Sequence, residues 1–175
     1  MKRIVAAALF ALSLVPAAAG AGSIGIGVYG GLSAPILYDT ASPGTQYGVR
    51  VPVNLIPLLT VEPYFDQTAL GDKDETLAGQ SYTRSGPDVT TFGANARFHL
   101  GTMYPYVGIG SATFKQSGSE DVTDTSLNFG LGLGFKLMPK LDLDVRAELS
   151  AIVTGETSRK IGYVNLGVSY ALFDF

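Results

Sequence analysis

The side chains of this sequence that could do chemistry are a single histidine, His99, and a set of charged residues at alternating positions. The set consists of Arg50, Glu62, Asp66, Arg97, Asp144, Arg146 and Glu148. If one narrow space holds these groups, carboxylates and guanidinium groups are expected to pair, because an unpaired buried charge is very costly. His99 stands between Phe98 and Leu100, with no serine in a matching pattern nearby. This context predicts a structural histidine and no catalytic nucleophile–base pair.

Acidic residues gather in two polar stretches that could attract a divalent cation. Neither stretch has the spacing of an EF-hand loop, which favours solvated loops over a metal site. The weak candidates for metal binding are Asp72, Asp74, Glu75, Glu120, Asp121 and Asp124. The segment Gly25-Ile-Gly27-Val-Tyr-Gly30 matches a dinucleotide-binding pattern, but no helix is predicted after it to receive a pyrophosphate. No cofactor is therefore expected.

The elements that must position these groups show a strict alternation of apolar and polar residues after residue 22. In the clearest case, every second residue is apolar: Leu127, Phe129, Leu131, Leu133, Phe135 and Leu137. Side chains of a strand point alternately to its two faces, so a period of two predicts strands. This run has the length of a tilted membrane-spanning strand, about 9–11 residues.

Eight segments of the chain carry this alternation. They cover residues 24–32, 46–54, 59–66, 92–100, 106–110, 126–137, 142–151 and 164–172. The predicted connections alternate in length. Short ones lie near Leu55–Leu58, Gly101–Met103 and Met138–Lys140, and long polar ones near Ala34–Thr45, Leu70–Asp88, Lys115–Thr125 and Thr154–Lys160. An even number of strands, with short turns on one rim and long loops on the other, is typical of outer-membrane barrels.

The two faces of these strands predict the surrounding medium. One face is almost purely Leu, Val, Ile, Phe and Ala, and the other carries Gly, Asn, Ser and the charged set. In lipid, a closed barrel pairs every backbone group within the protein. We therefore predict an all-β fold, an eight-stranded antiparallel up-and-down transmembrane β-barrel. Its apolar face meets lipid and its charges fill the lumen. A soluble sandwich would leave the strand length and the loop asymmetry unexplained.

The N-terminus has the features of an export signal. Lys2 and Arg3 precede an apolar core from Ile4 to Val15, which is too short to span a membrane. We predict a signal peptide over residues 1–19, with a second cleavage position after residue 21, and a barrel over residues 20–175. The net charge of −3 argues against a nucleic-acid partner, because phosphate binding needs clustered basic residues. The absence of cysteine excludes a disulfide framework.

Two segments resemble the OmpA/OmpX-like superfamily of small outer-membrane barrels. One is Tyr104-Pro-Tyr-Val-Gly-Ile-Gly110, and the other is the final strand with its terminal Phe175. The resemblance implies an outer-membrane location with both termini periplasmic. It also implies an insertion signal, read by the outer-membrane assembly machinery, in Asn165, Gly167, Tyr170, Leu172 and Phe175. The outward alternation ends at Leu172, so a bulge or short tail is expected before Phe173.

Three functions are compatible with such a barrel. The first is a structural, envelope-stabilising or surface-interaction role, with a charged network plugging the lumen and loops that could meet surface ligands or divalent cations. The second is a narrow channel or carrier for small solutes. The third, a lipid-modifying enzyme, would need a Ser/His/acid group near the outer rim, whereas His99 lies beside a short turn. An eight-stranded barrel is filled by its own side chains, which favours the first function and no enzymatic activity.

Overall fold

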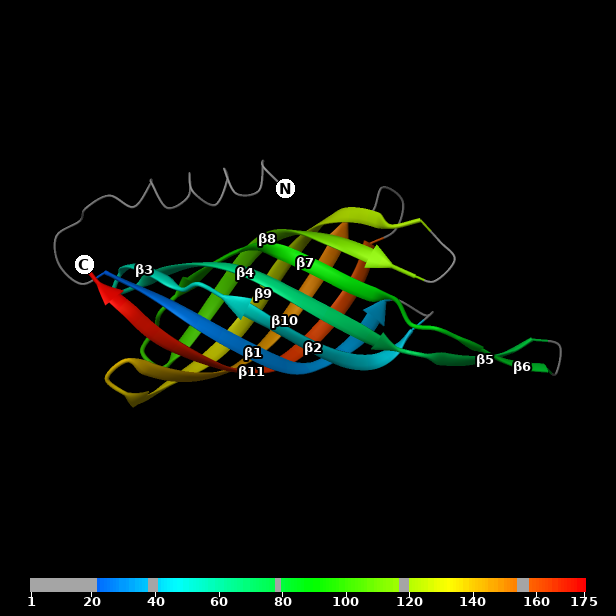
Figure 1. Ribbon diagram of the computed structural model, residues 1–175, viewed down its shortest axis with the longest axis horizontal. Helices are drawn as coiled ribbons and strands as arrows, with labels where there is room; N and C mark the ends of the chain where they lie inside the picture. Colours follow the sequence, from blue (N-terminus) through cyan, green and yellow to red (C-terminus); the bar gives the residue numbers. More distant parts are fainter. Residues whose placement is uncertain (1–21, 38–40, 78–79, 117–119, 154–157) are drawn as a thin grey trace.

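The computed structural model describes residues 22–37, 41–77, 80–116, 120–153 and 158–175 (Figure 1). The predicted signal peptide, residues 1–19, and the alternative cleavage position after residue 21 lie outside the described residues and stay predictions. Within the described part of the chain, no helix is long and apolar enough to cross a membrane.

Eleven strands make up the described fold. They are β1 (Ser23–Leu37), β2 (Ser42–Arg50), β3 (Val53–Ile56), β4 (Leu59–Gly71), β5 (Lys73–Leu77), β6 (Gln80–Arg84), β7 (Asp88–Phe98), β8 (Met103–Lys115), β9 (Val122–Met138), β10 (Leu141–Val153) and β11 (Ser158–Asp174).

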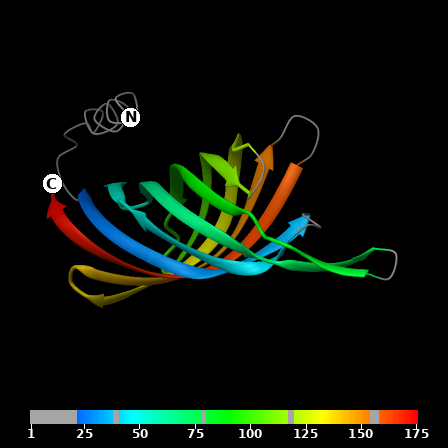
Figure 2. The same cartoon turned by 45° about the vertical axis from the view of Figure 1, so that its right-hand side comes forward.

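Nine of these strands form one closed antiparallel sheet. β2 and β3 form a single wall segment, because both pair with β1 on one side and β4 on the other. The interruption lies at Val51 and Pro52, where proline has no N–H for the ladder. β11 pairs with β1 and closes the sheet. The predicted eight-stranded up-and-down barrel is therefore confirmed, since eight wall segments follow one another around it (Figures 1 and 2).

The burial pattern is the reverse of that in a soluble barrel. The outward side chains Leu131, Leu133, Val145, Leu166 and Val168 are exposed, whereas inward polar groups such as Thr60 and Glu62 have no exposed surface. Leu149 shares the outward face and is half-buried. Exposed contiguous apolar surface of this extent requires a non-aqueous medium. The predicted division into a lipid face and a polar lumen face agrees with these side-chain positions.

The strands run further than the alternation predicts. β1 extends to Leu37 and β2 begins at Ser42, within the segment predicted as the loop Ala34–Thr45. The predicted long connection Leu70–Asp88 joins β4 to β7, and it contains the β5–β6 hairpin, which extends beyond the barrel wall (Figures 1 and 2). A hairpin with water on both faces keeps its backbone hydrogen bonds but needs no apolar face. Its sequence therefore lacks the alternation of apolar and polar residues that predicts a strand.

The opposite end of the barrel carries the three short turns. They lie at Pro57–Leu58, Gly101–Thr102 and Pro139–Lys140, and Gly101 adopts the left-handed conformation with φ 72°. The start of β1 and the end of β11 lie at this same end, where Gly22 and Phe175 exchange two backbone hydrogen bonds of 2.9 Å. The predicted bulge is confirmed, since Ile24 pairs with Phe173 and Gly25 with Ala171, which leaves Leu172 unpaired. We call this the short-turn end and the other the hairpin end.

Candidate functional site

The lumen is the site towards which the predicted charged residues point. Alternate residues of every wall strand face inward, and in a barrel this narrow their side chains fill the interior. From the short-turn end to the hairpin end, four layers follow one another along the strands: an open pocket, a cluster of arginines and carboxylates, a layer of carboxylates and tyrosines, and an apolar layer.

The arginine cluster consists of Arg50, Glu62, Arg97, Asp144 and Arg146. Glu62 accepts hydrogen bonds from Arg97 Nη1 at 2.7 Å and from Arg146 Nη1 and Nη2 at 2.5 and 2.9 Å. Asp144 accepts from Arg50 Nη1 at 3.2 Å and from Arg146 Nε at 2.9 Å, and it also pairs with Arg50 Nη2. Arg50 Nε lies 3.8 Å from Glu62 Oε2. All five side chains are buried, so the two carboxylates join three guanidinium groups in one desolvated network.

The cluster connects strands from all around the wall. β2, β4 and β7 supply Arg50, Glu62 and Arg97 in neighbouring strands, and β10 supplies Asp144 and Arg146 from the far side. The expected pairing of carboxylates with guanidinium groups in a narrow space agrees with this geometry for these five residues. Bidentate carboxylate pairing explains why arginine and not lysine stands at these positions.

Two tyrosines of β8 complete the packing, and sequence reasoning missed their contribution. Tyr104 Oη accepts a hydrogen bond of 2.9 Å from Arg146 Nε, and the Arg97 guanidinium lies 4.1 Å from the centre of the Tyr104 ring. The neighbouring Tyr106 ring is 6.2 Å away, measured between ring centres. Both rings lie against glycines of β9, where a Cβ at Gly130 or Gly132 would overlap them. The alternation of large residues on β8 with glycines on β9 is the sequence signal that could have identified this stack.

Two members of the predicted charge network lie outside the cluster. Tyr29 donates a 2.9 Å hydrogen bond to Asp66 Oδ2, and Tyr106 donates a 2.7 Å hydrogen bond to Glu148 Oε2. Among the described residues, neither carboxylate forms an ion pair. Asp66 and Glu148, predicted as members of the same charge network, thus hydrogen-bond tyrosines, and both lie nearer the hairpin end of their strands than Glu62 and Arg146 do.

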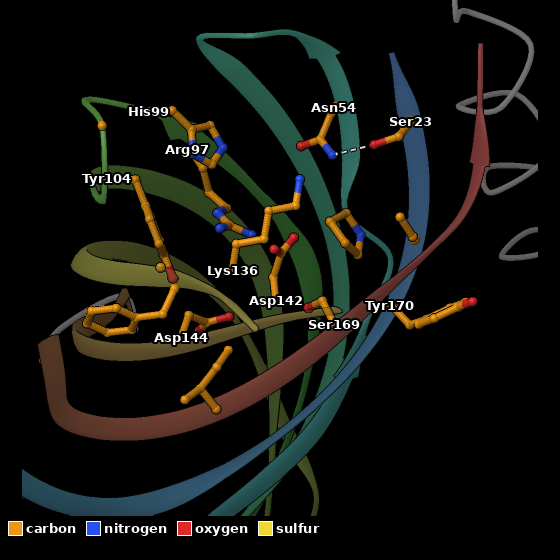
Figure 3. A pocket seen from close by; sticks show the side chains of 17 residues that line it. Ser23, Asn54, Arg97, His99, Tyr104, Lys136, Asp142, Asp144, Ser169 and Tyr170 are labelled. Carbon is orange, nitrogen blue, oxygen red and sulfur yellow. Dashed lines mark hydrogen bonds between the residues drawn. The ribbon is translucent and has the colours of Figure 1, made fainter. Parts of the chain in front are cut away.

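An open pocket of about 360 Å³ lies on the short-turn side of the cluster (Figure 3). Arg97, Tyr104 and Asp144 line it where it meets the cluster. Lys136 and Asp142 occupy directly paired positions of β9 and β10 and extend into it. His99 also lines the pocket, with Nε2 2.8 Å from Thr60 Oγ1. The pocket therefore ends at the cluster, and His99 has a structural contact there.

An apolar layer lies at the hairpin end of the lumen. Its members are Ala41, Leu70, Val89, Ala112, Phe114, Ile152, Ile161 and Tyr163. The Arg159 guanidinium lies 4.5 Å from the centre of the Phe114 ring. At this end of the barrel the inward positions of the strands carry apolar residues, whereas further along the same strands the inward positions carry polar ones.

The loop carboxylates do not gather into a metal site in the part of the chain that the structure describes, where no group of three or more His, Cys, Asp or Glu is positioned for one. Asp72 accepts from the Gly86 backbone N–H at 3.0 Å, and Asp74 accepts from Thr83 Oγ1 at 2.7 Å. The side chain of Glu75 lies outside the described residues. Glu120 and Asp121 are exposed and precede β9, whereas Asp124 lies within it.

The predicted insertion signal occupies both faces of β11. Asn165 and Gly167 face the lumen and are buried. Tyr170 and Leu172 are exposed on the outward face, and Phe175 follows the last residue of β11 at the short-turn end. Recognition by assembly machinery stays a prediction.

Comparison with known proteins gives the fold a family. No curated protein sequence matches the chain. Neisserial surface protein A, NspA, aligns with a TM-score of 0.59 and 16% identity over 87% of this chain and 99% of its own. A major outer membrane protein from Thermus thermophilus aligns with 0.57 and 13% over 87% and 100%. Ail, the attachment invasion locus protein of Yersinia pestis, aligns with 0.51 and 22% over 87% and 99%.

These structural likenesses concern the fold, and the family rests on the sequence match. The family described as outer membrane protein beta-barrel domain matches residues 4–171. The described strands of this chain form a closed antiparallel barrel with an apolar outer face, as the sequence predicts. The chain belongs to the outer membrane protein beta-barrel domain family and is an integral β-barrel of the outer membrane.

Proposed function

We propose that this protein is a structural and surface-interacting barrel of the envelope whose lumen is plugged. The observation that carries the proposal is the arginine cluster, which spans the lumen from β2, β4 and β7 to β10 through direct hydrogen bonds. A permeant solute would have to separate these buried pairs, and removing one partner of such a pair costs about 3–5 kcal/mol.

The apolar layer supports the same proposal independently. We expect this layer to close the hairpin end, because its apolar side chains cannot replace the water molecules around an ion. Hydrophobic constrictions oppose ion passage by excluding water. A channel would need a continuous polar path through both layers.

A lipid-modifying activity has little support among the described residues. His99 lies at the short-turn end and contacts Thr60, which is no part of a nucleophile–base–acid arrangement. We therefore propose that the barrel is not an enzyme.

The proposed orientation puts both ends of the barrel chain in the periplasm and the β5–β6 hairpin outside the cell. Short turns face the periplasm and longer connections the exterior in outer-membrane barrels. The hairpin is then the element that extends furthest towards surface partners, and the outward apolar residues contact lipid.

Planar-bilayer recordings of the purified protein test the plug. The unmutated barrel is expected to show no steady unitary current. Glu62→Ala, which deprives three arginines of their shared carboxylate, is expected either to destabilise the barrel or to open a leak. Asp142→Asn, in the open pocket, serves as the control without leak. Clear ion-selective unitary currents from the unmutated protein would overturn the plug and favour a channel.

A further inference from the structure

Arg97 is the least satisfied guanidinium group of the arginine cluster. Arg50 and Arg146 each donate hydrogen bonds from all three of their side-chain nitrogens. Arg97 donates one hydrogen bond among the described residues, from Nη1 to Glu62 at 2.7 Å, and its Nε has no partner there. Most of the N–H donors of Arg97 are therefore unmatched, although the side chain is only 10% exposed.

The cluster also holds one positive charge more than its carboxylates balance. Three guanidinium groups meet two carboxylates, and Glu62 Oε2, which Arg97 contacts, also accepts from Arg146 Nη2 at 2.9 Å. The other lumen carboxylates, Asp66 and Glu148, bond tyrosines on the hairpin side of the cluster and form no ion pair with Arg97 among the described residues. A buried charge without full compensation is costly, so a further anion beside Arg97 would stabilise the cluster.

The open side of Arg97 faces the pocket at the short-turn end. Arg97 lines this pocket together with Lys136 and Asp142, and all three side chains extend into the same space (Figure 3). Lys136 and Asp142 stand at directly paired positions, and their opposite charges balance each other. Asp144 also lines the pocket, but both of its oxygens bond arginines. The surplus positive charge of the cluster is therefore the net charge next to the pocket.

We propose that the pocket binds one small monovalent carboxylate, anchored by Arg97 and assisted by Lys136. The planar edge of a guanidinium group pairs with both oxygens of a carboxylate. The Tyr104 ring, whose centre is 4.1 Å from the Arg97 guanidinium, supports the anchor. The volume of about 360 Å³ falls within the range of ligand pockets, about 300–1,000 Å³. Asp142 opposes a second negative charge, which favours a monoanion.

Propionate is the probe for the carboxylate, and ethylammonium is a control of similar size and opposite charge. The refolded mature protein in detergent is titrated with sodium propionate in exchange for sodium chloride, at constant ionic strength. The titration is run at about pH 8, at which an imidazole is neutral and His99, the other titratable group of the pocket, adds no charge. Saturation-transfer NMR of the probe measures its affinity, and ¹⁵N spectra of the arginine Nε–H groups locate it. We expect saturable propionate binding that shifts the Arg97 signal, and no saturable binding of ethylammonium.

Replacement of the anchor should remove the site. Arg97→Gln is expected to weaken propionate binding about tenfold or more, because a hydrogen bond to a charged group contributes about 1.5–3 kcal/mol. The variant keeps two guanidinium groups and two carboxylates in the cluster, so it is expected to fold, which circular dichroism checks.

Three exposed residues of the short-turn end give a second test that does not alter the cluster. Lys136→Gln should weaken propionate binding and Asp142→Asn should strengthen it, each about twofold to fivefold, as expected for exposed charges. Lys140→Gln is the matched control, because Lys140 lies in a short turn and does not line the pocket. It should leave the affinity unchanged.

Two kinds of result would overturn the proposal. Absence of saturable propionate binding to the folded protein would mean that the barrel tolerates the surplus charge without a ligand. Equal effects of Lys136→Gln and Lys140→Gln, or an affinity that folded Arg97→Gln leaves unchanged, would place the anion outside the pocket. If Arg97→Gln does not fold, the opposite effects expected of Lys136→Gln and Asp142→Asn decide the question.

Discussion

At the level of single residues, charge identity explains the organisation of the lumen. Glu62 is the carboxylate shared by three arginines, and it has no exposed surface. Arg146 bonds both Glu62 and Asp144 and also Tyr104. Since each of these groups satisfies several others, the stability of the cluster depends on its complete membership.

Replacement of Glu62 by glutamine is expected to destabilise the barrel strongly. The substitution keeps the size of the side chain but leaves three guanidinium groups with Asp144 alone, which should lower the free energy of unfolding by about 3–5 kcal/mol. Urea titration of protein folded in lipid vesicles measures this. Asp142→Asn, which removes an exposed carboxylate of the pocket, should change it by less than about 1 kcal/mol. Equal effects of the two substitutions would show that the cluster contributes no special stability.

At the level of the strands, each wall element separates two media. β10 pairs with β11 over its whole length, from Leu141 with Tyr170 to Val153 with Ser158. The two side chains of each pair point to the same face of the sheet, either to lipid or to the lumen. A slip by one residue would exchange the two faces, so the register of these strands is strongly determined. The bulge at Leu172 changes the alternation only in the last residues of β11, from Leu172 to Asp174.

Arginine substitutions on these strands should report depth in the membrane. Leu166 lies at the middle of β11 and is 55% exposed, so Leu166→Arg should cost roughly 2–4 kcal/mol of folding free energy. Val153 lies on the same face at the hairpin end of neighbouring β10, where Val153→Arg should cost roughly 0–1 kcal/mol. Both values come from the same denaturant titration in lipid. A harmless Leu166→Arg would mean that this residue does not face the acyl chains.

At the level of the complete barrel, closure places the two kinds of connection at opposite ends. The pairing of β11 with β1 closes the barrel and places the start of β1 and the end of β11 at the short-turn end, and the β5–β6 hairpin extends from the opposite end (Figure 1). An antiparallel barrel with an even number of wall segments must have both ends of its chain on one side.

Protease treatment of intact cells tests the proposed orientation. Cleavage is expected within the β5–β6 hairpin, because the side chains of β6 (Gln80–Arg84) are exposed and the hairpin extends beyond the barrel wall (Figure 1). The same protease added after permeabilisation should gain access to the short turns. Cleavage of intact cells at Pro57–Leu58 or Pro139–Lys140, with the hairpin protected, would reverse the orientation.

The alternation of residues along the chain is enough to predict the number of wall segments and the medium that each face meets. Both are local properties, because side-chain direction alternates along a single strand whatever its partners are, as in the run from Leu127 to Leu137. The same pattern locates the three short turns and the bulge before Phe173, since each interrupts the alternation.

Which charges meet depends on how the strands are assembled. Strands of a barrel are tilted and staggered, so the height of a side chain in the lumen depends on the register of every strand between it and its partner. Glu62 thus reaches Arg146 across the lumen, whereas Asp66 and Glu148 lie beyond the cluster and bond tyrosines. The alternation of apolar and polar residues also fails to predict the β5–β6 hairpin and the apolar layer. The hairpin lies outside the barrel wall, and the apolar layer has apolar residues at inward positions where the pattern predicts polar ones.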